Sequence, residues 1–232
     1  MPPFINTLFL SLIGGILPSL IWLWFWLKED RLHPEPKSRI MLVFLLGMTS
    51  VFIVLPIEKA IYHIPWGGIS ILTVLLWAST EEIFKYLAGY FGALRGKDLD
   101  EPIDAIIYMI TAALGFSALE NALFLSNLID VGLFSESIIT GNSRFIGATL
   151  LHVASSASIG VMMGLSFYKK PVFKKIFLFT GLSASIVLHT LFNLLIIKLE
   201  SNIFLVFSGV WIVLLMIIVL IEKVKSIRAP RT

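Results

Sequence analysis

The segment GISILTVLLWASTEEIFKYLAGYFGAL, residues 68–94, is long and apolar enough to cross a bilayer, yet Glu81, Glu82 and Lys85 lie near its middle. A stretch of about 18 or more apolar residues is typical of a transmembrane helix. One charged side chain at the centre of such a helix costs roughly 2.5–3.5 kcal/mol, so these residues usually face a partner or a water-filled cavity. The segment therefore predicts both a membrane fold and the place where chemistry would occur.

The composition of the whole chain is that of a membrane protein. Of its 232 residues, 57% are hydrophobic and 14% are charged, and the mean hydropathy is +0.92. The net charge of +3 gives no support for nucleic acid binding, because most basic residues lie in short connections, where they set topology. The sequence contains no cysteine, which excludes disulfides, thiolate metal sites and cysteine nucleophiles.

Apolar runs recur along the chain, and each is long enough to cross a bilayer with some tilt. They lie at about residues 4–27, 39–63, 68–94, 102–129, 143–168, 175–198 and 203–221. No low-complexity tract or internal repeat marks a second domain. We therefore predict an all-α, polytopic membrane protein with about seven transmembrane helices. It would form a single integral-membrane domain over residues 1–232, with a catalytic core at about 68–198.

Basic residues gather in alternate connections between the predicted helices and in the C-terminal tail. Loops rich in Lys and Arg remain on the cytoplasmic side of a membrane. This distribution predicts that the N-terminus is outside and the C-terminus cytoplasmic. The residues concerned are Lys28, Arg31, Lys37, Arg39, Arg95, Lys97, Lys169, Lys170, Lys174, Lys175, Lys223, Lys225, Arg228 and Arg231.

Small residues predict where helices approach one another closely. Gly160 and Gly164 are four residues apart, and the small side chains of residues 154–158 precede them. Such residues allow helix backbones to pack tightly in membranes, so we interpret this face as a packing surface. Pro18 and Pro56 lie inside predicted helices, where the missing amide donor favours a kink.

The intramembrane polar residues become informative when their depths are compared. With a rise of about 1.5 Å per residue, Glu81 lies near the middle of its span. Glu120, His152 and His189 each lie about nine residues, or roughly 14 Å, from the outer ends of the next three spans. Four consecutive helices are therefore expected to place titratable groups at nearly the same depth.

Local spacing adds detail, because residues three or four apart share one face of a helix. Lys85 follows Glu82 by three residues and Glu81 by four. We expect the lysine to neutralise one glutamate while the other points elsewhere. His189 and Asn193 are also four apart, so the amide could orient the imidazole or hold a substrate carbonyl.

Carboxylates and imidazoles at one depth suit the hydrolysis of a peptide bond. A glutamate can act as general base on a water, and histidines with a carboxylate can hold zinc. The same residues would also serve a proton-coupled transporter with a Glu/His relay, or a non-catalytic scaffold. Outside this group, Glu58 is expected at the membrane interface, and Asp104 is interpreted as a helix-start residue favoured by the helix dipole.

Motifs on successive predicted helices resemble, in their order, those of the PrsW family of intramembrane proteases. They are Glu81-Glu82-x-x-Lys85, Phe116-x-x-x-Glu120-Asn121, His152 and His189-x-x-x-Asn193, and the resemblance covers about residues 77–197. The wider group includes CAAX-processing and bacteriocin-processing membrane proteases. The CAAX-processing enzymes typically have histidine where this chain has Glu120, and arginine where it has Lys85, so these positions favour PrsW.

The resemblance implies an intramembrane endopeptidase of the prokaryotic plasma membrane that cuts membrane proteins or peptides. The type member cleaves an anti-sigma factor as the first step of regulated proteolysis. By position, the resemblance implies that Glu81, Glu82, Glu120, His152, His189 and Asn193 are catalytic, with Glu120, His152 and His189 as candidate ligands of zinc or another divalent metal, and Lys85, Phe116 and Asn121 as supporting residues. It leaves open which of Glu81 and Glu82 is the general base, and whether a metal is required.

Overall fold

The structure is a computed structural model. It describes residues 3–31, 33–64, 68–198 and 203–229, and for residues 3–6 and 203 it describes the backbone alone. Arg231 of the predicted basic tail lies outside the described residues. The helices are α1 Pro3–Trp26, α2 Lys37–Tyr62, α3 Ile71–Gly89, α4 Asp104–Asp130, α5 Phe134–Ile146, α6 Ala148–Leu165, α7 Pro171–Lys198 and α8 Ile203–Lys225. A 3₁₀ turn, Leu27–Asp30, follows α1, and a π-helical turn, Tyr90–Leu94, extends α3. The described part of the chain has no strand, which confirms the all-α prediction.

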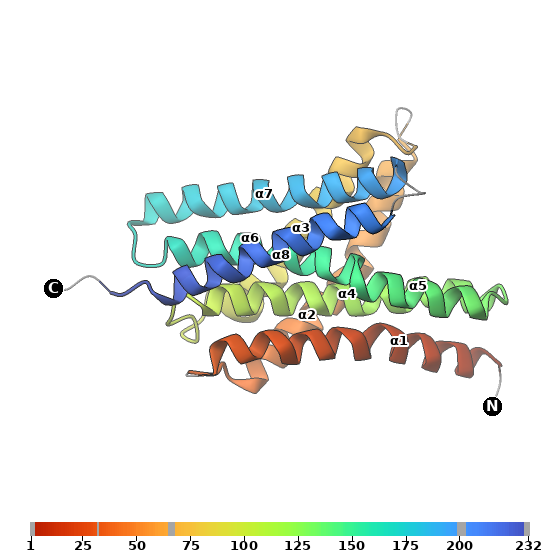
Figure 1. The fold of residues 1–232 in the computed structure, drawn as a ribbon, viewed down its shortest axis with the longest axis horizontal. Coiled ribbons are helices and arrows are strands. Elements are labelled where there is room, and N and C mark those ends of the chain that lie inside the picture. The colour runs from red at the N-terminus through yellow and green to blue at the C-terminus, as the bar shows by residue number, and fades with distance from the viewer. Residues whose placement is uncertain (1–2, 32, 65–67, 199–202, 230–232) are drawn as a thin grey trace.

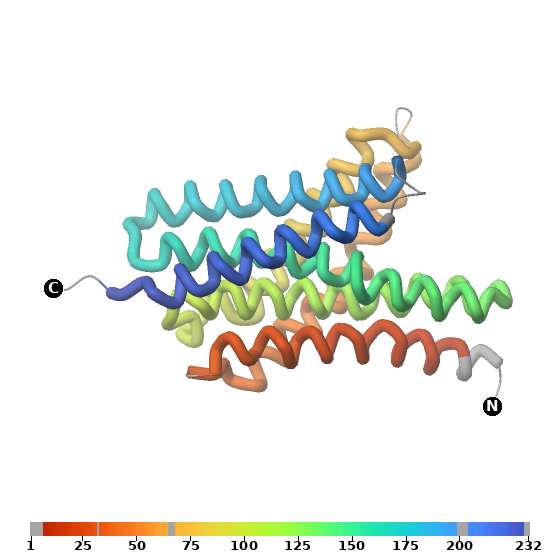
Figure 2. The backbone as a smooth tube through the Cα atoms, in the orientation of Figure 1, coloured from red at the N-terminus to blue at the C-terminus, as the bar shows by residue number. Residues whose placement is uncertain are grey.

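Six stretches of the described chain are long and apolar enough to cross a membrane: α1 with its 3₁₀ turn, α2, α4, α5 together with α6, α7, and α8. Composition alone does not support the predicted span at 68–94, because three charged residues lie in α3. That helix nevertheless packs inside the bundle, against α2, α4 and α7. The start of α1 and the end of α8 lie at opposite ends of the long axis, as an odd number of crossings requires (Figures 1 and 2).

The predicted fifth span, residues 143–168, has different limits in the structure. The helical stretch begins earlier, at Phe134, and is interrupted at Gly147 between α5 and α6. Phe207 of α8 lies against this glycine, where an added Cβ would come within 2.1 Å of its ring. The glycine at the break therefore allows α8 to pack closely against it.

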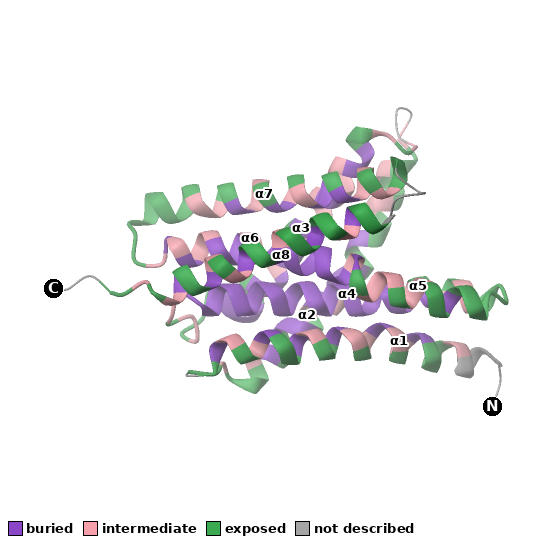
Figure 3. Ribbon diagram, viewed as in Figure 1, coloured by how far each residue is buried: buried purple, intermediate pink, exposed green. Residues whose placement is uncertain are grey.

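Helix α4 forms the centre of the bundle, and 89% of an 18-residue apolar stretch within it is buried (Figure 3). Glycines on neighbouring helices allow them to approach it. A Cβ at Gly47 of α2 would lie 2.2 Å from the carbonyl oxygen of Ala112, and one at Gly160 of α6 would lie 2.6 Å from the Cα of Ile106. The interpretation of the Gly160 face as a packing surface is therefore confirmed.

The outer faces of the surrounding helices are apolar and exposed, as expected of surfaces that contact lipid. Examples are Phe9, Trp24, Phe52, Phe179 and Phe204. Figure 3 shows these exposed faces around the buried α4. Because the exterior is apolar, the buried charged groups are a property of the interior that needs its own explanation.

We expect Gly160→Ala to lower the free energy of unfolding by about 1–3 kcal/mol, because the added methyl group would press on the backbone of α4. Denaturant unfolding in detergent micelles measures the change. Gly209→Ala is the matched control, since no atom lies within 4 Å of a Cβ at that helical position. Equal stability of the two variants would contradict tight packing at Gly160.

Candidate active site

The charged group of α3 lies inside the protein. Ser70 begins the helix by accepting a hydrogen bond from the amide of Thr73. Further along, Lys85 Nζ donates to Glu81 Oε2 at 3.0 Å and to Glu82 Oε1 at 2.8 Å. The expectation that the lysine binds one glutamate while the other points elsewhere is wrong, because both carboxylates reach the same ammonium group.

Glu82 is fully buried and receives hydrogen bonds from three helices. Its Oε1 lies 2.8 Å from both Lys85 Nζ and His189 Nδ1. Its Oε2 accepts from Ser156 Oγ at 2.9 Å and from Ser185 Oγ at 2.7 Å. A carboxylate has about four lone-pair sites, so these four donors occupy all of them.

The same contacts orient the ring of His189. Glu82 accepts a hydrogen bond from Nδ1, so in the neutral imidazole Nε2 keeps its lone pair. Nε2 lies 3.8 Å from Glu81 Oε1, which is too far for a direct hydrogen bond. An acceptor nitrogen therefore faces one oxygen of Glu81.

His152 has the opposite arrangement of its ring nitrogens. Lys85 Nζ donates to Nδ1 at 2.8 Å, so the proton is on Nε2, which donates to Glu120 Oε2 at 2.9 Å. The rings of His152 and His189 meet edge to face with centroids 5.2 Å apart. Phe116 lies beside the group, with Lys85 Nζ 4.4 Å from its ring centroid.

Arg144 of α5 completes the polar network, although the sequence analysis assigned it no role in the site. It donates to Glu120 Oε2 at 2.7 Å and, through Nε, to Asn121 Oδ1. Its guanidinium also lies over the ring of Phe124, 4.5 Å from the centroid. Asn121 thus supports the site by holding the arginine that pairs with Glu120.

A cavity of about 560 Å³ opens onto this network. Glu81, Glu120, His152, His189 and Asn193 all line it, so the structure brings these sequence-predicted residues to one place. Glu82 does not line it, and its side chain is fully buried. Of the paired glutamates, Glu81 is therefore the one that a molecule in the cavity can contact.

The ligand geometry differs from the candidate metal set of the sequence analysis. Glu81, His152 and His189 each offer one ligand atom, and these atoms lie within 4.8 Å of one another. Glu120 is not in this group, since its carboxylate is bound to His152 Nε2 and to Arg144. One carboxylate and two imidazoles form a donor set typical of zinc.

The charges of the network do not cancel. Three carboxylates, Glu81, Glu82 and Glu120, face two cations, Lys85 and Arg144, which leaves one net negative charge. Glu58, which was expected at the membrane interface, lies one turn before the end of α2 with a half-buried side chain, and its carboxyl group interacts with that of Glu81.

Some site residues were missed although the sequence contains a signal for them. Ser156 is four residues after His152, and Ser185 is four residues before His189. Each serine therefore shares a helix face with a site histidine, and both bind Glu82. Glu58 carries no comparable signal, because its neighbour Glu81 is on another helix.

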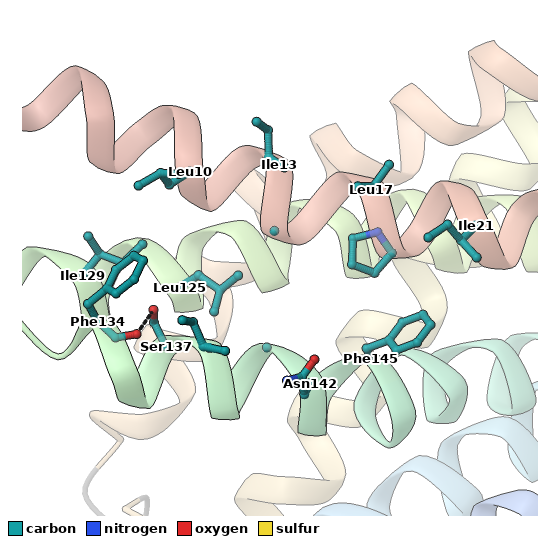
Figure 4. Close-up of a pocket in the computed structure, with 14 residues that line it drawn as sticks. Leu10, Ile13, Leu17, Ile21, Leu125, Ile129, Phe134, Ser137, Asn142 and Phe145 are labelled. Atoms are coloured by element: carbon teal, nitrogen blue, oxygen red, sulfur yellow. Dashed lines mark hydrogen bonds between the residues drawn. The ribbon is translucent and has the colours of Figure 1, made fainter. Parts of the chain in front are cut away.

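A second cavity, of about 380 Å³, lies between α1 and α5 (Figure 4). Its lining is mainly apolar and includes Leu10, Ile13 and Leu17 on α1, Leu125 on α4 and Phe145 on α5 (Figure 4). Its lining residues include no Asp, Glu, His, Lys or Arg. We therefore assign the chemistry to the cavity lined by Glu81.

Comparisons with known proteins agree with this geometry. The profile of the PrsW family of intramembrane metalloproteases matches residues 35–221. A Protease PrsW of Halalkalibacterium halodurans is 28% identical over 94% of this chain and 97% of its own. That of Geobacillus kaustophilus is 31% identical over 70% and 67%, and that of Bacillus subtilis is 30% identical over 68% and 67%.

No solved structure matches the chain. The family match extends beyond the motif-bearing helices to α2 and most of α8. It favours a protease over a transporter or a scaffold, and the bacterial relatives and apolar helices indicate a plasma membrane protein. The chain belongs to the PrsW family of intramembrane metalloproteases, and it is an integral membrane endopeptidase.

Proposed function

We propose that the chain cuts membrane-anchored proteins within the bilayer, with Glu81 as the general base. The observation that carries this assignment is the difference between the paired glutamates. Glu82 has four hydrogen-bond donors and does not line the cavity, whereas Glu81 lines it. Of the two paired glutamates, only Glu81 can both contact a water in the cavity and accept its proton.

In the proposed reaction, Glu81 takes a proton from water while the water oxygen bonds to the carbonyl carbon of the substrate. Lys85 holds the other oxygen of Glu81 and fixes the orientation of the carboxylate. When the carbon–nitrogen bond breaks, Glu81 returns the proton to the leaving amine. Asn193 lines the cavity one turn beyond His189, which supports a role in binding the carbonyl oxygen.

The donor set fits the metal that the family description implies. Glu81, His152 and His189 would hold zinc, and Glu120 would orient His152 through its Nε2 proton. A bound zinc polarises a carbonyl and lowers the pKa of a water. Lys85 now occupies the lone pair of His152 Nδ1, so ligation through that nitrogen requires the ammonium group to withdraw.

The lining of the cavity supports a hydrophobic substrate. Ile139, Ile196, Ile197 and Phe207 surround the charged groups on the side of α5, α7 and α8. These side chains suit a transmembrane segment, while Arg144 and Asn193 offer donors to its backbone carbonyls. We propose a single-pass anti-sigma factor as the first substrate to test, on the strength of the motif resemblance.

We expect Glu81→Gln to reduce kcat about 100- to 10,000-fold with little change in stability, because it removes the base and a single hydrogen bond. Glu82→Gln should in addition lower the free energy of unfolding, by about 3–5 kcal/mol, because it leaves buried donors unpaired. Cleavage of a tagged anti-sigma factor in liposomes and unfolding in detergent measure the two effects. Glu136→Gln, an exposed change on α5, is the control.

The opposite pattern would reverse the two assignments. If Glu81→Gln retained wild-type cleavage, Glu81 would not be the base. Wild-type cleavage by both variants would refute hydrolysis by this glutamate pair. Flux across the membrane that depends on Glu81, without cleavage of any membrane protein, would favour the transporter.

Metal content tests the second part of the proposal. We expect purified active enzyme to contain about one zinc per chain, and a chelator to abolish cleavage until zinc is restored. His189→Ala should lose the metal, because it removes a ligand. Fully active enzyme without stoichiometric metal would refute the zinc site and leave Glu81 as base unaffected.

Arg144→Ala is expected to lower kcat/KM about 10- to 100-fold, because Glu120 would lose the cation that positions it. Arg144→Lys should recover part of this loss by keeping the charge near Glu120. The control is Arg95→Ala, since Arg95 is exposed and lies over Phe91 away from the cavity. Equal activity of Arg144→Ala and wild type would show that Arg144 does not position the site.

A further inference from the structure

A second group of acidic side chains lies at the other end of the bundle from the cavity mouth. Asp30 ends the turn after α1, Glu35 lies in the connection to α2, and Asp104 begins α4. Asp104 and Glu120 are on the same helix, 16 residues or roughly 24 Å apart. The acidic group is therefore separate from the active site.

The three carboxylates converge. Each offers one oxygen, and these oxygens lie within 4.8 Å of one another. Asp30 is only 5% exposed and Asp104 only 1%. The buried Oδ2 of Asp30 has no hydrogen-bond partner in the described part of the chain, which is unusual for a buried carboxylate.

Neighbouring groups hold the other two carboxylates in place. Asp104 Oδ2 accepts from the amides of Asp100 and Glu101 at 2.9 and 2.6 Å. Glu35 accepts a hydrogen bond from the hydroxyl of Tyr108. These contacts fix the direction of the carboxylates, as outer partners do around metal ligands.

Three basic side chains nearby are paired with other acids. Arg39 binds Asp98 at 2.7 Å, His33 binds Glu101 at 2.8 Å, and Lys225 binds Glu29 at 2.6 Å. Among the described residues, no salt bridge joins a cation to Asp30, Glu35 or Asp104, although Lys37 lines a cavity with Asp30 and Glu35. The three carboxylates therefore have no salt-bridged counter-ion in the described part of the chain.

Glu35 shows why the arrangement calls for a partner of opposite charge. Its half-buried carboxyl lies beside those of Asp104 and Asp30. Burial of like charges is unfavourable unless something offsets it. A bound cation would supply that offset.

We propose that Asp30, Glu35 and Asp104 bind one divalent cation of the hard, oxygen-preferring class, Mg²⁺ or Ca²⁺. All three ligands are carboxylates, which is the donor type such ions prefer. Ligand oxygens at about 2.1–2.5 Å from a common ion can be up to about 5 Å apart, which agrees with the observed convergence. The ion would fasten the connection between α1 and α2 to the start of the central helix.

An ion can reach the group from the protein surface. Asp30 lines a cavity of about 250 Å³ bordered by Glu29 and Glu101. It also lines one of about 310 Å³ that includes Glu35 and Lys37. Asp30 therefore borders both cavities, and Glu35 borders one of them.

The test uses the full chain in detergent, stripped of metal and then given Mg²⁺ or Ca²⁺ alone. At a free ion concentration about ten times the Kd, we expect Tm to rise by roughly 3–6 °C. Asp30→Asn should abolish this rise, while its Tm without metal should equal or exceed that of wild type, because one repelling charge is gone. Glu222→Gln is the control, since Glu222 is an exposed acid near the same end, outside the group.

His152→Ala removes a candidate zinc ligand of the active site and leaves the acidic group unchanged. This variant should therefore retain the rise in Tm. Loss of the response in His152→Ala with retention in Asp30→Asn would overturn the proposal. So would a wild-type Tm that responds to neither ion. Equilibrium dialysis of wild type gives a readout that needs no Asp30 variant: one Mg²⁺ or Ca²⁺ per chain supports the site, and none overturns it.

Discussion

The rest of the structure depends on the burial of the Glu82 carboxylate. Its donors come from α3, α6 and α7, so one anion joins three helices that are distant in sequence. Such a charge is stable inside a bilayer only when its hydrogen bonds are complete. Glu82 therefore fixes the relative positions of Lys85 and His189, and the reactive groups take their places from it.

The small residues around α4 make this arrangement possible. Close approach at Gly47 and Gly160 lets α2 and α6 lie directly on the central helix. Glu120 projects from α4 toward His152 of α6, so the contact between these helices also brings two site residues together. Packing and chemistry thus depend on the same helix–helix interfaces.

Much of this could be predicted from the sequence, because a bilayer forces long apolar helices and makes buried charges conspicuous. The predicted span at 175–198 agrees with α7, and depth comparison placed Glu81, Glu120, His152 and His189 near one another. The contacts of Arg144 and Glu58 with the site residues could not be predicted from the depth of each residue in its helix. Their contacts depend on how α5 and α2 are rotated about their axes. The pattern of apolar residues along the sequence does not determine these rotations.

Phe207 has a consequence for how the enzyme is made. It belongs to α8, outside the motif-bearing region, yet it lines the cavity, stacks on Phe192 and lies against the break at Gly147. The ribosome makes α8 after α1–α7. The cavity wall is therefore incomplete while the earlier helices enter the membrane, and the active site of this protease is finished only once α8 has been made.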